Sequence, residues 1–196
     1  MINLLTDINA YIFTGGQSRR LHADKSLVQL HGKTLTEIIH KKLNLVFDNI
    51  YIVGKNNNFP DCNFIKDIKS VQCPLNGIVT ALEHTQNDWI FVIACDLPLV
   101  NSYIINELHS NINSKAQVIA PSVNNRLQPL CAFYHKSVLK NFNSAIEKGN
   151  YSLMKLLNQI DLVKITILLE DEEQFLNINY QEDLARATEL LKNIRQ

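Results

Sequence analysis

The sequence predicts an α/β domain in which helices cover both faces of a doubly wound, mostly parallel sheet. First, the segment Trp89–Ala94 is nearly all apolar and about one strand long, as a central strand buried on both faces should be. Second, strand patterns are repeatedly followed by helical patterns, which is the order of right-handed crossovers in a parallel sheet. We therefore expect a single three-layer, Rossmann-like domain that spans residues 1–196.

Local patterns predict the individual elements. Ile8–Phe13 is a strand pattern that ends abruptly at Thr14. Thr34, followed three residues later by Glu37, is typical of a helix N-terminus, and apolar residues recur at helical spacing from there to Val46. The other expected elements are strands at 49–53, 63–65, 117–121 and 162–168, helices at 74–84, 102–110, 137–147 and from 181, and apolar segments at 130–134 and 152–159.

The composition is that of a globular protein, with 46% apolar and 19% charged residues. Lys plus Arg equals Asp plus Glu at 19 each, so no net field favours nucleic acid or an anionic membrane. The apolar runs are far shorter than the roughly 20 residues of a membrane helix. Four cysteines without CxxC spacing, and a start without a secretory leader pattern, favour a reducing cytoplasm.

A glycine-rich segment follows the first expected strand. Gly15 and Gly16 stand where the carboxyl ends of parallel strands present ligand sites, and without Cβ atoms they let a phosphate approach the main chain. Arg19 and Lys25 can neutralise its charge. The spacing fits neither the Walker A pattern nor GxGxxG. A strand-ending turn with solvated basic residues is the alternative for a Gly-Gly pair considered alone.

The segment 13–25, FTGGQSRRLHADK, resembles the signature loop LAGGxSxRMGxDK of the molybdenum cofactor guanylyltransferases and their nucleotidyltransferase relatives. Further segments resemble family motifs in the family's order: LHGKTL at 30–35, CPLNG at 73–77, CDLP at 95–98, QPLCAFY at 128–134, and FLNIN with EDL at 175–179 and 182–184. The resemblance implies a nucleotidyltransferase-type sheet, GTP as donor, and molybdopterin or the molybdenum cofactor as acceptor. It also implies transient contact with other cofactor-biosynthesis proteins.

The resemblance carries residue roles with it. The nucleotide-binding residues that it implies are Phe13, Thr14, Gly15, Gly16, Lys25, Gly54, Asp67 and Asp96. Arg19 suits the charge that develops around the α-phosphate, because a planar guanidinium serves this purpose better than an ammonium. Arg20 is equally compatible with a structural role.

Asp96 is expected to hold Mg²⁺ as the cofactor. It follows an apolar strand and offers the hard oxygen ligand that Mg²⁺ prefers, and this ion commonly takes only one or two carboxylates plus waters and phosphates. The alternative is a helix N-cap before Pro98. Arg19, Lys25 and Asp96 are the expected catalytic residues, and no strong general base is needed because an acceptor phosphate is already ionised.

The expected acceptor-binding residues are Gln128, Pro129, Asn177 and Asn179. Turn or loop formation is the alternative for these residues. Thr14, His22 and Cys73 depart from the family pattern, where Ala, Gly and Gly are usual. These departures leave two other functions open: a related transferase that uses CTP or a sugar or polyol phosphate acceptor, and a non-catalytic nucleotide-binding protein.

Overall fold

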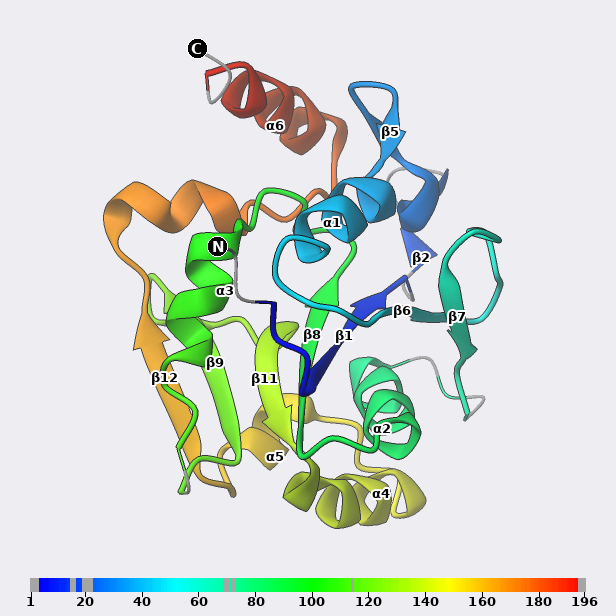
Figure 1. Ribbon diagram of the computed structural model, residues 1–196, viewed down its shortest axis with the longest axis vertical. Helices are drawn as coiled ribbons and strands as arrows, with labels where there is room; N and C mark the ends of the chain where they lie inside the picture. Colours follow the sequence, from blue (N-terminus) through cyan, green and yellow to red (C-terminus); the bar gives the residue numbers. More distant parts are fainter. Residues whose placement is uncertain are drawn as a thin grey trace.

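The computed structural model in Figure 1 describes residues 4–14, 17–18, 23–68, 71, 73–113 and 115–193. Its main sheet has the strand order β10-β9-β11-β8-β1-β6-β7, and β12 pairs with β9. The strands are β1 (Ile8–Phe13), β6 (Ile50–Gly54), β7 (Asn63–Lys66), β8 (Trp89–Ala94), β9 (Val118–Val123), β10 (Arg126–Leu127), β11 (Cys131–His135) and β12 (Leu162–Thr166). Two small pairs stand apart: β2 (Gln17–Ser18) with β3 (Ala23–Asp24), and β4 (Gln29–Leu30) with β5 (Lys33–Thr34).

Six α-helices and three 3₁₀ turns lie among the described residues. The helices are α1 (Leu35–Leu43), α2 (Pro74–His84), α3 (Ser102–His109), α4 (Leu139–Glu147), α5 (Leu153–Leu157) and α6 (Gln181–Asn193). The 3₁₀ turns are η1 (Lys25–Leu27), η2 (Lys136–Val138) and η3 (Leu169–Phe175). None of the helices in this part of the chain is long and apolar enough to span a bilayer.

The mostly parallel sheet confirms the predicted fold class. Strand β1 runs parallel to both β6 and β8, β6 runs parallel to β7, and β12 runs parallel to β9. Strand β11, however, runs antiparallel to both β8 and β9. The sequence did not predict this reversal, because a strand buried on both faces has the same apolar pattern in either direction.

Helices cover both faces of the sheet, as Figure 1 shows. Alternate side chains of β1 point to opposite faces, so that Ile8, Ala10 and Ile12 pack with α1 and α3, whereas Tyr11 and Phe13 pack with α2, α4 and α5. All five side chains are at most 6% exposed. A third, smaller cluster joins α6 to the β4–β5 hairpin and the start of α1. The predicted three-layer arrangement is therefore present.

The start of α1 follows the predicted pattern. The N–H of Glu37 donates to Thr34 Oγ1 at 3.2 Å, and the N–H of Thr34 donates to Glu37 Oε2 at 2.7 Å, which together form a capping box. The helix ends at Leu43, before Val46, whose side chain is 2% exposed in the turn that follows. Burial of Val46 outside the helix explains why the apolar periodicity extended further than the helix does.

Four strand ends lie level at one edge of the sheet. Phe13 is in register with both Val53 and Ala94, and Val53 is in register with Ile65. The residues just beyond these strands therefore emerge side by side, as expected where parallel strands end. Main-chain hydrogen bonds extend the pairing past the strands: Thr14 N to Val53 O at 3.0 Å, Asp67 N to Gly54 O at 2.9 Å, and Cys95 N to Phe13 O at 3.0 Å.

Candidate active site

Three predicted site residues from distant parts of the chain meet at this edge. Lys25 begins η1, Asp96 lies just beyond β8, and Asn179 precedes α6. The Nζ atom of Lys25 lies 2.9 Å from Asp96 Oδ2 and also donates a hydrogen bond to Asn179 Oδ1. The side chains of Lys25 and Asp96 are only 16% and 19% exposed. A partly buried ammonium is thus held between two oxygens, each of which suits a cation.

The start of α6 fixes Asn179. Asp183 Oδ2 accepts hydrogen bonds from the main-chain N–H groups of Asn179 and Tyr180, both at 2.8 Å. Next to this cap, the N–H of Ile178 donates to the carbonyl oxygen of Asp96 at 2.9 Å. Sequence reasoning did not single out Asp183, although an acid in the first turn of a helix is a recognisable capping signal.

Three of the predicted nucleotide-binding residues lie at the ends of neighbouring strands. Thr14 Oγ1 donates to Val53 O at 3.1 Å, and a Cβ added to Gly54 would lie only 2.3 Å from that hydroxyl oxygen. Asp67 follows β7, and burial raises the pKa of its carboxyl group. Thr14, Gly54 and Asp67 therefore form a continuous row beside the Lys25 and Asp96 pair.

The side chain of Phe13 lies in the core. It is 6% exposed, and its ring lies 3.3 Å from where a Cβ on Gly77 would be, so that this glycine lets α2 approach β1 closely. The predicted contact of Phe13 with a nucleotide stays a prediction.

The predicted acceptor residues divide into two groups. Gln128 and Pro129 precede β11, and Leu130 O accepts a hydrogen bond from Ala94 N at 2.8 Å, which places this segment beside the end of β8. The buried Tyr134 hydroxyl donates to Pro129 O at 2.8 Å. Asn177, in contrast, makes a local contact, since its Nδ2 donates to Phe175 O at 3.3 Å.

Several predicted residues lie outside the described residues, namely Gly15, Gly16 and Arg19, together with Arg20 and His22. Asp96 is not a helix cap, because the N-cap of α3 is Asn101, whose side chain accepts from Ile104 N at 3.1 Å. Within the described ranges, no cluster of three or more His, Cys, Asp or Glu side chains is placed to hold a metal ion.

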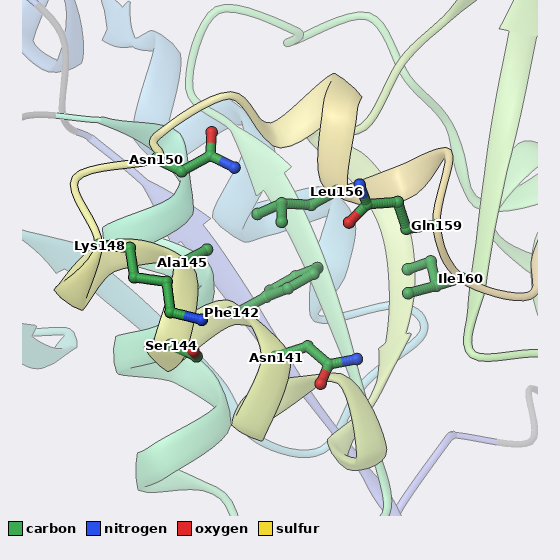
Figure 2. Close-up of a pocket in the computed structure, with 9 residues that line it drawn as sticks. All are labelled: Asn141, Phe142, Ser144, Ala145, Lys148, Asn150, Leu156, Gln159 and Ile160. Carbon is green, nitrogen blue, oxygen red and sulfur yellow. The ribbon is translucent and has the colours of Figure 1, made fainter.

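A pocket of about 350 Å³ lies between α4 and α5, away from the predicted site residues (Figure 2). Phe142 and Leu156 form part of its apolar floor, and Lys148 lies at its rim. Helix α4 follows β11, whose last residue His135 pairs with Trp89 at the amino end of β8. The pocket is therefore at the opposite end of the sheet from Asp96 and contains none of the predicted site residues.

A largely parallel sheet with a lysine, a carboxylate and an amide gathered at its carboxyl edge is typical of an open-sheet α/β protein that binds its ligand at that edge. The model of the MobA-like NTP transferase domain matches residues 10–163. The chain belongs to this MobA-like NTP transferase family.

Individual relatives agree with this assignment. A molybdenum cofactor guanylyltransferase of Campylobacter jejuni is 28% identical over 191 residues, which cover 96% of this chain and 99% of the relative. A probable molybdenum cofactor guanylyltransferase of Clostridium perfringens is 32% identical, covering 93% and 98%. The crystal structure of molybdopterin-guanine dinucleotide biosynthesis protein A from Archaeoglobus fulgidus has the same fold, with a TM-score of 0.83, 24% identity, and coverage of 94% and 99%.

Proposed function

We propose that this chain transfers the GMP group of GTP to the terminal phosphate of molybdopterin or the molybdenum cofactor, releasing pyrophosphate and forming the guanine dinucleotide. Relatives that bear the name molybdenum cofactor guanylyltransferase align over nearly the whole of both chains, which supports this donor and this acceptor. The observation that carries the proposal is the meeting of Lys25, Asp96 and Asn179 at the carboxyl edge of the sheet.

The reaction is a displacement at phosphorus. An oxygen of the acceptor's terminal phosphate attacks the α-phosphorus of GTP, and the bond from that phosphorus to the bridging oxygen of the β-phosphate breaks. Pyrophosphate leaves with the bonding electrons. Because the acceptor phosphate is already ionised, positioning and charge stabilisation suffice. The Lys25 ammonium would donate to the triphosphate oxygens and offset their charge as it redistributes, and Arg19 would do so at the α-phosphate.

The residues present fit a bound Mg²⁺. Asp96 Oδ2 and Asn179 Oδ1 both face one cation, the Lys25 ammonium, so their oxygens already converge on positive charge. Both are hard oxygen donors of the kind that Mg²⁺ selects. Asp96, with Asn179, would hold the ion, which when bound supplies charge stabilisation and orients the phosphates. Thr14, Gly54 and Asp67 would contact the nucleoside, and Gln128 and Pro129 the acceptor.

Substitution of Asp96 by Asn tests the catalytic assignment. This change retains the shape of the side chain but removes its charge, and we expect pyrophosphate release from GTP, Mg²⁺ and molybdopterin to fall by roughly a hundredfold or more. Asp88→Asn is the matched control, because Asp88 pairs with Lys136 near the opposite end of β8. Near-normal turnover of Asp96→Asn at saturating Mg²⁺ would refute the role given to this carboxylate.

Thermal unfolding with each of the four nucleoside triphosphates and Mg²⁺ tests which base the donor nucleotide carries. GTP is expected to raise the midpoint temperature of unfolding most, since a ligand that binds only the folded state stabilises it. Stronger protection by CTP would overturn the guanylyl assignment. Binding of GTP without pyrophosphate release in the presence of molybdopterin would show a nucleotide-binding protein without catalysis.

A further inference from the structure

Helix α1 contacts both chain segments that carry the paired residues of the site. Near its start, the fully buried Thr36 donates from Oγ1 to Ser26 O at 3.2 Å. Near its end, Lys42 donates from Nζ to Pro98 O at 2.6 Å and to Val100 O at 3.2 Å. Ser26 directly follows Lys25, and Pro98 and Val100 lie two and four residues after Asp96. One helix therefore reaches both sides of the ion pair.

The contacts of Lys42 are made to main-chain carbonyl groups. The ion pairs found among the described residues involve Lys25, Lys136 and Arg186, and not Lys42. Burial lowers the pKa of the Lys42 ammonium to about 8. An ammonium in such surroundings is costly unless its donors are satisfied, so the two carbonyl acceptors hold it at one place.

The loop that Lys42 holds is packed from within. Leu97, Leu99 and Val100 are 2%, 6% and 2% exposed, and Leu97 N donates to Ala94 O at 3.2 Å. Ile178 N binds the carbonyl oxygen of Asp96 at the start of the same loop. The loop is thus anchored by α1 on one side and by the segment before α6 on the other.

We propose that Thr36 and Lys42 are positioning residues, through which α1 holds Lys25 and Asp96 in place for group transfer. This inference rests on the proposed function. Neither side chain touches the reacting atoms; Thr36 acts through the main chain of Ser26, and Lys42 acts through the loop that follows Asp96. A displacement of about 1 Å at a catalytic group can cost roughly a hundredfold in rate, so these anchors matter for turnover.

The experiment compares variants that remove the donors with variants that retain them. Thr36→Val and Lys42→Met nearly preserve volume but donate no hydrogen bond, whereas Thr36→Ser and Lys42→Arg still can. Lys41→Met is the matched control, because Lys41 is exposed on the same helix and its side chain makes no hydrogen bond or ion pair among the described residues. Pyrophosphate release from GTP, Mg²⁺ and molybdopterin is measured for each protein, with circular dichroism to establish folding.

We expect kcat to fall about tenfold in Thr36→Val and in Lys42→Met, with the KM for GTP changed by less than about threefold. Thr36→Ser and Lys42→Arg should recover most of the lost kcat, and Lys41→Met should match the wild type. If the two donor-free variants are folded and their kcat equals that of Lys41→Met, the inference is overturned. A change confined to KM overturns it as well.

A fold defect in one variant does not remove the test. Should Lys42→Met fail to fold, Thr36→Val alone decides, and an unchanged kcat in that variant overturns the inference. The wild type and the Asp96→Asn variant together separate the two proposals. A wild type that releases no pyrophosphate from GTP, Mg²⁺ and molybdopterin refutes the proposed function and the positioning role with it, whereas full activity of Asp96→Asn refutes the role given to this carboxylate. An inactive Asp96→Asn together with normal Thr36→Val and Lys42→Met refutes the positioning role alone.

Discussion

The main-chain N–H of Ile178 donates a hydrogen bond to the carbonyl oxygen of Asp96 at 2.9 Å. This bond attaches the segment before α6 to the loop after β8 without using a side chain. One residue further on, Asn179 accepts a hydrogen bond from Lys25, which itself pairs with Asp96. A shift at the start of α6 would therefore disturb the whole cluster, and this connection underlies the first two predictions.

Lys25 and Asp96 should be energetically coupled. Lys25→Met and Asp96→Asn are each expected to lower the free energy of unfolding by about 1 kcal/mol, because each leaves a partly buried partner without its counter-charge. The double variant should lose less than the sum of the two, as measured by denaturant unfolding. The same cycle on Lys136 and Asp88, whose side chains are 53% and 65% exposed, is the control and should show weaker coupling. Strictly additive losses at Lys25 and Asp96 would contradict the prediction.

Asp183 should matter for both stability and turnover. Asp183→Ala removes the acceptor of two main-chain N–H groups at the start of α6 and is expected to cost about 1 kcal/mol of stability. Because Asn179 then loses its anchor, pyrophosphate release should also fall. Glu182→Ala is the control, since Glu182 lies in the same first turn and makes no side-chain hydrogen bond among the described residues. Equal effects of the two substitutions would count against a specific role of Asp183.

Thr14 and Gly54 should be mutually dependent. Gly54→Ala places a Cβ atom 2.3 Å from Thr14 Oγ1 and is expected to cost about 1–3 kcal/mol through overpacking. Adding Thr14→Ala removes the obstructing hydroxyl and should recover more than half of that loss. Thermal unfolding of both single variants and of the double variant measures the effect. No recovery in the double variant would show that the obstruction lies elsewhere.

The lowered pKa of the Lys42 ammonium should make the stability of the protein depend on pH. Its pKa is about 8 in the folded protein, against an ordinary value of 10.5, so the unfolded chain binds more protons between these two values. Stability therefore rises as pH increases from about 8 to about 10.5, by an amount on the order of 2 kcal/mol.

The comparison with Lys42→Met isolates this contribution. The stability of the wild type relative to Lys42→Met should increase over this pH range, as measured by urea unfolding at several pH values. Burial also shifts two tyrosines, since it raises the pKa of Tyr11 and of Tyr134. Both tyrosines are present in both proteins, so their contributions to the difference in stability cancel. A difference that stays constant with pH would show that Lys42 does not titrate as its burial implies.

Much of the fold could be predicted because its signals are local. The apolar runs at β1 and β8 and the capping box at Thr34 and Glu37 were both expected from neighbouring residues. The antiparallel direction of β11 was not predicted, because a strand buried on both faces has the same apolar pattern in either direction.

The sequence by itself determined the α/β class, the order of the motifs, and the choice of Lys25, Asp96 and Asn179 as site residues. Only the tertiary structure decided that these three side chains touch and that α1 anchors both sides of the pair through Thr36 and Lys42. The physical reason is that these anchoring bonds go to main-chain groups. Every residue has a carbonyl group and nearly every residue an N–H, so such a partner leaves no mark in the sequence and is identified only when distant segments are folded together.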